Sequence, residues 1–472
     1  MVVVIGAGHN GLVAAVRLAA AGVDVTVLEA ADAPGGGVRS DALTLPGFIH
    51  DTCSGFFPLT AASPAFRALE LDVDWVNPER PMAHVFEDGS AISLLRDLDA
   101  TAAVVGEPWR RLVKRLCAVR SPLIRAALGR FPPVRPLIEL GKEAVLLAPL
   151  APLPSSVLGR RLFGDDDRRA AWLAGSGAHA DIPPSMPGSG AFSLGLNFLG
   201  HLVGWPFPRG GAQGLTDALV ERLRWHGGEV RCGVEVRSIE ELKADAVLCT
   251  ASPAVLMRLV PEGALPGRLR RWDYGLGTLK LDYGLRGPVP WLSDEARRAA
   301  VVHVGGPLDE IAGSLDQAIK GEFPSRPVLV VGQHTLFDSS RAPAGQHTLY
   351  VYARVPQRPG LSSDEMAERV EARIERFAPG FRSTVLARSI RTPAEIERDN
   401  PSMAGGDLAS GSLVPQQQLM FRPHPRLCRY RTPLDGLYVA GGWVYPGPGV
   451  HGMPGWNAAQ TILEDLRGRS RS

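Results

Sequence analysis

The amino-acid sequence predicts an α/β fold built around a dinucleotide-binding domain of the Rossmann type. Three observations support this prediction. A strand, a glycine turn, a helix, a second strand and an acidic residue follow one another in residues 1–29. A glycine turn, a helix and strands return in residues 208–253. The chain ends with a strand, a Gly/Pro loop and a helix in residues 436–466.

The N-terminal motif has each residue type that binding a pyrophosphate requires. Gly6 permits a tight turn after the first strand, and Gly8 lets a pyrophosphate approach the backbone. Gly11 allows close packing of the following helix on the strand. Glu29, at the end of the second predicted strand, is placed to accept hydrogen bonds from ribose hydroxyls. The alternative is a glycine turn with a purely structural role.

A second glycine-rich stretch, Gly35–Gly37, is followed by the cation Arg39. One interpretation is a second contact with the same pyrophosphate, and the other is a flexible turn. Two glycine loops on either side of one ribose-binding acid favour an extended dinucleotide.

Composition limits the class of protein. The chain has 472 residues and a formal net charge of +2, so we expect two domains and no nucleic-acid partner. Its five cysteines form no C-x-x-C pair, so neither a redox dithiol nor a metal site is predicted. No apolar run reaches about 18 residues, and the first strand begins at residue 2. These features predict a cytoplasmic protein without a signal peptide.

The stretch from 107 to 154 differs in character from its surroundings. It combines a basic amphipathic pattern, with arginines such as Arg110, Arg120 and Arg130, with an apolar part interrupted by prolines. Such a stretch is typical of a peripheral contact with a membrane surface, or of the solvated face of a helical cap domain. The sequence leaves both interpretations open.

Five sequence blocks together resemble the phytoene-desaturase-like branch of the FAD-dependent amine oxidase superfamily. Within it, the chain looks most similar to the pyridine nucleotide-disulfide oxidoreductase domain-containing protein 2 type. In chain order the blocks are IGAGHNGLVAA, GGGVRS with PGFIHD, PRGGAQGLTDAL with GVEVRSI, GGDLASG with FRP, and LYVAGGWVYPGPGVHGMPGWNAA. They span nearly the whole chain, and the last is the most specific.

The resemblance implies a glutathione-reductase-like fold, in which a mixed α+β substrate domain is inserted into an FAD-binding Rossmann domain. We predict FAD-binding segments at 1–75, 205–265 and 425–472, and substrate-domain segments at 76–204 and 266–424. Because no second motif of the GxGxxG kind is present, a resident NAD(P) domain is not expected. Electrons would pass to oxygen, a quinone or an unsaturated substrate.

The same resemblance assigns the cofactor contacts. The pyrophosphate would lie on the three glycines of the first turn and continue along Gly36 and Arg39, with Glu29 on the adenosine ribose. Val236, expected in a strand, would meet the adenine end through its backbone. Gly441, Gly442 and Val450 would line the flavin, with the N-terminus of the last helix directed at its pyrimidine ring. The acid usual in the superfamily after the C-terminal strand is replaced by Gly442.

Two side chains are candidates for catalysis. Lys280, in the predicted strand GTLKLDYGL, resembles the amine-oxidase lysine that holds a water near flavin N5; the alternative is the polar face of an ordinary strand. His451, in the C-terminal block, could contact the flavin or a substrate, or only bond to backbone. Arg422, before Pro423, would position a loop over the flavin or have a structural role.

These observations favour flavin-dependent oxidation of a lipophilic or polyene-like small molecule, with hydride moving from an activated C–H bond to flavin N5. A flavin amine or amino-acid oxidase is the alternative within enzymes. A protein that holds FAD but acts through partner binding, with little turnover, is an alternative of another class. A homodimer is compatible with each of these.

Overall fold

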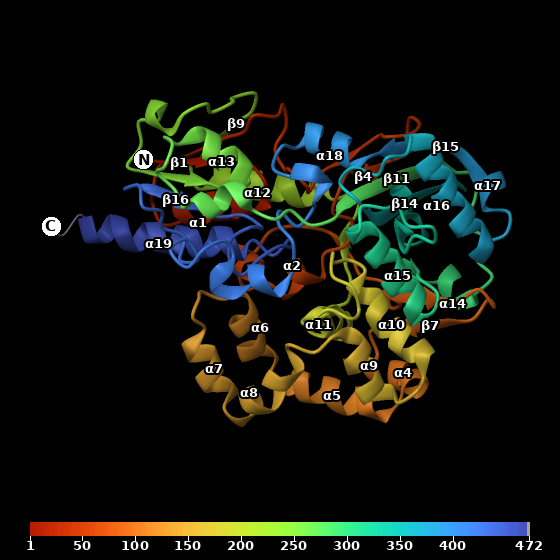
Figure 1. The fold of residues 1–472 in the computed structure, drawn as a ribbon. Coiled ribbons are helices and arrows are strands. Elements are labelled where there is room, and N and C mark those ends of the chain that lie inside the picture. Colours follow the sequence, from red (N-terminus) through yellow and green to blue (C-terminus); the bar gives the residue numbers. More distant parts are fainter. Residues whose placement is uncertain (470–472) are drawn as a thin grey trace.

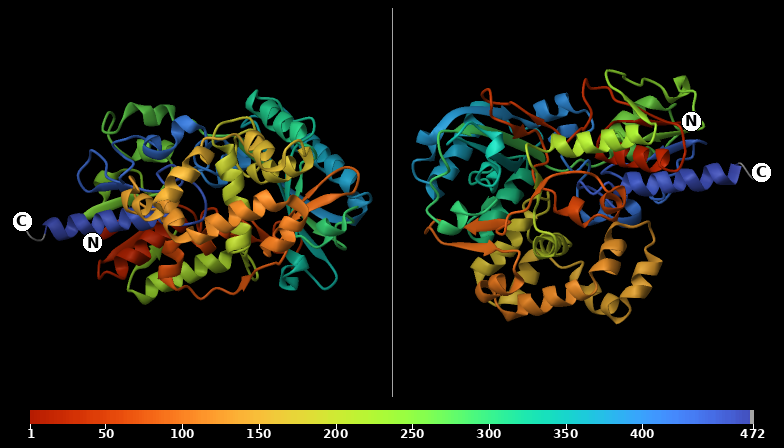
Figure 2. Two further views of the ribbon diagram at one scale, coloured as in Figure 1. Left: turned by 90° about the horizontal axis from the view of Figure 1, so that it is seen from below. Right: turned by 180° about the vertical axis from the view of Figure 1, so that it is seen from behind.

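The computed structural model describes residues 1–469, and in it two β-sheets are covered by helices (Figure 1). One sheet has five strands and the other has seven. Helices between residues 98 and 202 form a layer below both sheets, and the front and back views agree on this arrangement (Figures 1 and 2). The predicted α/β class, with a Rossmann-like sheet and a mixed substrate-domain sheet, is confirmed.

The five-stranded sheet has the order β16-β10-β1-β2-β9, and every neighbouring pair in it is parallel. Parallel strands need crossover connections, and here those connections are long enough to contain most of the chain. The strands are β1 (Val2–Ile5), β2 (Val25–Leu28), β9 (Glu229–Arg231), β10 (Ala246–Cys249) and β16 (Leu437–Val439). This sheet therefore draws its strands from three separate parts of the chain.

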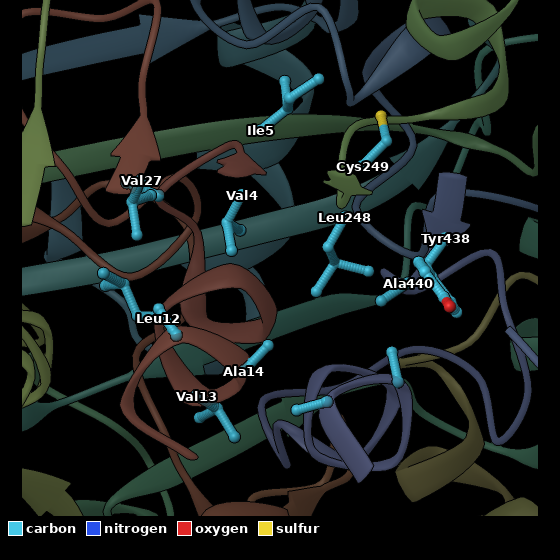
Figure 3. Close-up of a cluster of buried hydrophobic side chains, with 14 of the residues drawn as sticks. Val4, Ile5, Leu12, Val13, Ala14, Val27, Leu248, Cys249, Tyr438 and Ala440 are labelled. Atoms are coloured by element: carbon cyan, nitrogen blue, oxygen red, sulfur yellow. The ribbon is translucent and has the colours of Figure 1, made fainter. Parts of the chain in front are cut away.

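The core of this part of the molecule lies between the sheet and the first helix, α1 (His9–Ala19). Figure 3 shows Val4, Val27 and Leu248 on three neighbouring strands, and Leu12 and Val13 on the helix packed against the sheet. These side chains are completely buried, which accounts for the apolar strands and the apolar helix face in the sequence.

Five further helices belong to this half of the molecule. They are α2 (Pro58–Ala62), α3 (Pro64–Leu69), α12 (Gln213–Trp225), α13 (Pro253–Leu259) and α19 (Met453–Arg469). Of these, α12 and α19 are long and the others are short. The predicted segment 425–472 ends in residues 470–472, which lie outside the described residues.

The seven-stranded sheet has the order β15-β11-β14-β13-β12-β6-β7 and is antiparallel except between β6 and β12. Its strands are β6 (Met82–Val85), β7 (Ala91–Leu94), β11 (Gly277–Leu285), β12 (Val301–Val304), β13 (Leu329–Gly332), β14 (His347–Val355) and β15 (Val385–Arg391). One face packs on α16 (Ser363–Phe377) and the other on α10 (Asp167–Gly177) and α11 (Ser189–Leu202). Side chains therefore alternate between two apolar cores along each strand.

The helical layer follows β7 along the chain. Its members are α4 (Leu98–Val105), α5 (Glu107–Ala118), α6 (Arg120–Leu128), α7 (Val134–Leu140), α8 (Lys142–Leu147), α9 (Ser155–Phe163), α10 (Asp167–Gly177) and α11 (Ser189–Leu202). The helices α14 (Asp294–Arg297), α15 (Leu308–Ile319), α17 (Phe381–Thr384) and α18 (Pro393–Asp399) belong to the second half of the chain. Within residues 1–469 no helix is both long and apolar enough to cross a membrane.

Two small strand pairs complete the fold. They are β3 (Ser40–Asp41) with β4 (His50–Asp51), and β5 (Trp75–Val76) with β8 (Phe207–Pro208). The second pair joins the two ends of the predicted insertion 76–204, so the chain leaves and returns at one place. The domain boundaries themselves stay predictions.

The prediction of a strand that contains Val236, after α12, is wrong. Only β9 forms there, and Val236 lies five residues beyond its end in an irregular segment. The backbone N–H groups of Gly233 and Val234 donate to Ala31 and Glu29 carbonyls at 2.9 Å. These bonds hold the chain beside the end of β2 and end the regular pairing.

Candidate active site

The first glycine turn has the conformation that its residue types predicted. Gly6 has a φ of +97°, which favours glycine, and it follows β1 directly. A Cβ atom on Gly11 would lie 2.0 Å from the Gly6 carbonyl oxygen, so only glycine lets the helix pack this closely on the turn. A Cβ atom on Gly8 would meet nothing within 4 Å. One side of Gly8 is therefore open to an approaching group.

Glu29 lies at the end of β2 and turns its carboxylate back to the glycine turn. Its two oxygens accept hydrogen bonds from the N–H groups of Ala7, at 2.7 Å, and Ala31, at 2.9 Å. Each carboxylate oxygen has a second lone pair, so these bonds leave acceptor capacity for a ribose hydroxyl. The role of Glu29 in holding the ribose stays a prediction.

The second glycine loop pairs directly with the first. The N–H group of Gly35 donates to the Ala7 carbonyl at 2.9 Å, and Gly35 forms a parallel bridge with Gly8. Gly36 also has a positive φ, of +57°, and its Cβ position lies 3.3 Å from the Gly8 Cα. The Arg39 side chain packs against Gly35. Two stretches that the sequence predicted to share one pyrophosphate are thus side by side.

The C-terminal block reaches the same place from the other end of the chain. A Cβ atom on Gly441 would lie 2.9 Å from the Thr250 carbonyl oxygen, and the Thr250 hydroxyl donates to the Ile5 carbonyl at 2.9 Å. Val450 is half-buried against the core of the parallel sheet, and its carbonyl accepts from the Thr60 hydroxyl. Thr250 therefore connects the first turn with the predicted flavin loop.

Two long helices begin at this junction. The N-terminus of α19 crosses α1 so closely that a Cβ atom on Gly455 would lie 1.9 Å from the Asn10 carbonyl oxygen. His9, the first residue of α1, hydrogen-bonds to the carbonyl of Gly449, while burial lowers its pKa to about 4. Helix N-termini present unpaired N–H groups and a positive dipole end, so two of them together favour negative charge.

We call Gly6–Gly11, Gly35–Gly37 and Gly441–Gly452 the glycine cradle. Its open side at Gly8 and its two helix N-termini fit a ligand with a pyrophosphate and a second electron-rich end. FAD has both of these, because the reduced flavin carries negative charge near N1 and O2. The residues of the chain thus fit this cofactor.

His451 lies in the cradle, but its ring is already engaged. Its Nδ1 accepts a hydrogen bond from the N–H of Met453 at 3.2 Å, and its ring N–H donates to the carbonyls of Gly447 and Pro448. Burial lowers its pKa to about 3, so the imidazole is neutral. The contacts favour the backbone-bonded interpretation, in which His451 fixes the start of α19, and the catalytic role stays a hypothesis.

Lys280 lies in β11, as predicted, with its side chain 1% exposed. Its ammonium pairs with the Asp282 carboxylate and lies 4.4 Å from the centre of the Tyr350 ring. Burial lowers the pKa of Lys280 and raises the pKa of Asp282, while their ion pair opposes both shifts. This cation therefore has a partner within its own strand.

The ion pair belongs to a larger buried group of charges, which we call the Lys280 network. The Asp282 carboxylate lies 3.6 Å from His50 Nδ1, and the adjacent Asp51 accepts from Arg341 at 2.7 Å. The members are His50, Asp51, Lys280, Asp282, His334, Asp338, Arg341 and Tyr350. The sequence block PGFIHD contains two of them, yet nothing in its pattern indicated their partners.

One loop connects the network with the cradle. The Tyr350 hydroxyl donates to the Cys53 carbonyl at 2.5 Å, and the N–H of Ser54 donates to the Gly37 carbonyl at 3.0 Å. Residues 52–55 thus lie between the sheet that carries Lys280 and the second glycine loop. Lys280 is thus linked to Gly37 of the cradle through the Tyr350 ring and the backbone of Cys53 and Ser54.

Arg422 connects two loops through backbone carbonyls, and its predicted role of placing a loop over the flavin stays a prediction. Its guanidinium is completely buried and donates to the carbonyls of Gly442, at 2.9 Å, and Ala409, at 3.1 Å. Burial lowers its pKa to about 10. Because all its acceptors are neutral carbonyls, Arg422 holds the loop that starts at Ala409 against the start of the predicted flavin loop.

Val236 is the predicted cofactor residue that the fold places differently. It packs at the edge of the core of the parallel sheet rather than within a strand. Its backbone contact with an adenine ring stays a prediction. Residues 1–469 contain no group of three His, Cys, Asp or Glu side chains arranged to hold a metal ion.

Comparison with known proteins agrees with this geometry. The family model described as flavin containing amine oxidoreductase matches residues 11–463. The chain is 28% identical to pyridine nucleotide-disulfide oxidoreductase domain-containing protein 2 of Rattus norvegicus, over 98% of this chain and 93% of that protein. It is also 28% identical to hydroxyneurosporene desaturase of Cereibacter sphaeroides, over 100% and 99% of the two chains.

A solved structure has the same fold over the full length. An oxidoreductase from Methanosarcina mazei matches with a TM-score of 0.65 and 17% identity, over 98% of this chain and 99% of that one. At this identity the likeness concerns the fold alone. It indicates that the two sheets and the helical layer form one known architecture.

Proposed function

Because the chain belongs to the flavin-containing amine oxidoreductase family, we propose that it is an FAD-dependent dehydrogenase of the desaturase type. In this proposal FAD would accept a hydride at N5 from an activated C–H bond of a lipophilic or polyene-like substrate, and the neighbouring carbon would release a proton to water, so that a double bond forms as FAD is reduced. The observation that carries the cofactor part is the glycine cradle, where two helix N-termini meet beside the open side of Gly8.

When bound, the flavin would supply the two-electron acceptor for the reaction. The residues of the chain would supply position and electrostatics. Gly6, Gly8 and Gly36 would admit the pyrophosphate, and the N-terminus of α19 would favour negative charge at the pyrimidine end. Arg422 would keep the loop from Ala409 onward in place over the ring. No proton transfer by His451 is needed in this scheme.

The proposed substrate class is supported by the names of similar proteins. Hydroxyneurosporene desaturase and two phytoene desaturases match over at least 96% of the chain at 26–28% identity, and a limonene dehydrogenase chain from Castellaniella defragrans matches over 98% at 23%. These names denote removal of hydrogen from carbon in molecules of low polarity. We extend only that reaction class to this chain.

The experiment is anaerobic reduction of the purified protein. If the proposal holds, the protein is yellow, and a phytoene-like polyene or limonene bleaches the flavin absorbance whereas putrescine and amino acids do not. Bleaching by amines alone would contradict the proposed substrate class. A colourless protein that cannot be reconstituted with FAD would contradict the cofactor assignment as well.

A flavin amine or amino-acid oxidase is the second candidate, and Lys280 is the observation that favours it. The lysine is buried in a strand that resembles the amine-oxidase strand and lies beside the Tyr350 ring. If this candidate is right, amines bleach the flavin, and Lys280→Met slows the bleaching while FAD stays bound.

A protein that holds FAD for partner binding is the candidate of another class. It is favoured by the replacement of the usual acid by Gly442 and by the engaged ring of His451. A yellow protein that is bleached by none of the polyenes, terpenes or amines would support it over both enzymes.

A further inference from the structure

The helices α6, α7 and α8, which we call the helical arm, bury very little of their apolar surface. In α6 and α8 no residue is buried, and in α7 only Leu140 is. Large apolar side chains of the arm are instead exposed, at Val134 (53%), Leu137 (47%), Ile138 (73%), Val145 (74%) and Leu146 (48%). Exposed apolar groups this close together mark an interaction surface.

The exposed side chains have the spacing of one helix face. Val134, Leu137 and Ile138 follow the i, i+3, i+4 pattern on α7, and Val145 lies one turn into α8. Only Gly141 separates the two helices. The preceding helix α5 differs, because Trp109, Val113 and Leu116 are buried in the core against α10 and α11. The arm is thus the uncovered part of the stretch 107–154.

The net charge around the helical arm indicates which kind of partner would cover its apolar face. Residues 107–154 contain nine Lys and Arg and three Glu, a net charge of +6 in a chain of net +2. Four of these cations have carboxylate partners: Arg110, Arg115, Arg125 and Arg130. Within residues 1–469 no carboxylate pairs with Arg111, Lys114, Arg120, Arg135 or Lys142. The apolar face is therefore bordered by cations without anionic partners.

We propose that the helical arm docks on the surface of an anionic lipid bilayer. Apolar side chains beside lysine and arginine heads match the apolar interior and the anionic headgroups of such a surface. A second copy of this chain is the other occupant to consider. In a twofold dimer the same patch would face itself, so the two excesses of positive charge would repel each other. The charge thus favours the bilayer over a homodimer.

The arm is attached to the cofactor end of the molecule. The Tyr445 hydroxyl donates to the Ala126 carbonyl at 3.2 Å, and the rings of Tyr445 and Phe131 pack edge to face at 5.4 Å. Arg130 forms an ion pair with Glu464 of α19 at 2.8 Å. Tyr445 lies within the Gly441–Gly452 part of the cradle. If the proposed function holds, docking would bring the bilayer, where a lipophilic substrate dissolves, next to this loop.

The test is co-sedimentation of the full chain with vesicles, which requires no turnover and is therefore independent of the proposed reaction. Vesicles of phosphatidylcholine with phosphatidylglycerol are compared with vesicles of phosphatidylcholine alone, at low and high salt. We expect binding to the anionic vesicles that weakens at high salt. The variant Ile138→Glu with Val145→Glu should bind at least about tenfold more weakly, because two membrane-facing side chains become charged.

Two further variants keep the test decisive. Trp225→Glu is the matched control, since Trp225 is 74% exposed on α12 outside the arm, and its binding should equal that of the wild type. Arg135→Gln with Lys142→Gln should lose much of the salt dependence without losing its fold. Absence of binding at low salt, or equal binding by the double glutamate variant, would overturn the proposal. So would a wild-type dimer that the double glutamate variant converts to a monomer.

Discussion

The glycine cradle is made of backbone, whereas the Lys280 network is made of side chains. In the cradle, Gly11 and Gly455 let main chains approach so closely that any Cβ atom would collide with a carbonyl oxygen. In the network, charged groups from β4, β11 and the segment 338–341 meet where water is excluded. The first depends on the absence of side chains and the second on their exact pairing, so the two should respond differently to substitution and to pH.

The largest expected effect is a loss of stability in mild acid, which comes from buried histidine side chains in the cradle, in the network and in the rest of the molecule. Burial lowers the pKa of seven histidines from 6.5 to values of about 3 to 4. They are His9, His50, His84, His179, His201, His334 and His451.

Between pH 6.5 and about 4 these imidazoles bind protons in the unfolded chain but stay neutral in the folded one. The free energy of unfolding therefore falls as the pH falls, by up to about 1.4 kcal/mol per pH unit for each histidine. Above pH 6.5 the contribution of these neutral histidines to the free energy of unfolding is fully retained. Thermal unfolding between pH 8 and 4 measures this, and an unfolding temperature that stays constant from pH 6.5 to 5 would contradict it.

Asp51→Asn should come next in size. The change keeps the shape of the side chain and its bond from the Ala212 N–H but removes the charge that faces Arg341 at 2.7 Å. Removing one partner of a buried cation lowers the free energy of unfolding by about 3 kcal/mol. Denaturant unfolding measures the loss.

Asp74→Asn is the control for this prediction. Asp74 pairs with Arg209 at 2.7 Å, but their side chains are 68% and 49% exposed, so water screens the pair. The unfolding midpoint should stay close to that of the wild type. Equal losses for Asp51→Asn and Asp74→Asn would mean that the Lys280 network is not the buried, paired cluster described above.

Lys280→Met should have a smaller effect that depends on pH. The substitution leaves Asp282 buried without its cation, and burial then raises the pKa of Asp282 further. Between the ordinary pKa of an aspartate and this raised pKa only the unfolded chain carries the charge, so the variant loses stability as the pH rises through that window. We expect a loss of about 1–3 kcal/mol at neutral pH.

The double variant Lys280→Met with Asp282→Asn should recover most of that loss, because no buried charge is left unpaired. A double-mutant cycle on unfolding free energies checks this. A double variant that is less stable than Lys280→Met alone would show that the ion pair is not what stabilises this part of β11.

The two regions also differ in how far the sequence could predict them. The cradle follows from local patterns: Gly6, Gly8 and Gly11 within one turn, and the strand and loop around Gly441. The strand β11 was predicted with the bounds that the structure has, since its apolar residues alternate clearly. The exposure of the helical arm could not be predicted, because a basic amphipathic pattern fits solvent and a membrane equally well.

The network could not be predicted because its members come from distant segments. Asp51 and Arg341 are 290 positions apart, and nothing near either residue indicates the other. The early end of β9 was also not predicted, since the bonds that end it depend on the backbone of Glu29 and Ala31. Side-chain pairings of this kind depend on the tertiary fold and not on spacing.

A smaller and more selective effect is expected from substitution at the open side of the cradle. Gly8 has a φ of −69° and a ψ of 169°, which alanine adopts without strain, and its Cβ position is free of contacts. Gly8→Ala should therefore leave the unfolding temperature of the FAD-free protein unchanged. Gly11→Ala should lower it, because its Cβ would lie 2.0 Å from the Gly6 carbonyl oxygen.

Titration of FAD into the FAD-free wild type and Gly8→Ala proteins is the most direct test of the central claim, that the glycine cradle holds this cofactor. We predict saturable binding to the wild type and an affinity at least about tenfold lower for Gly8→Ala, because its methyl group fills the place of approach of the pyrophosphate. Absence of FAD binding by the folded wild type, or equal affinity of the two proteins, would contradict the account.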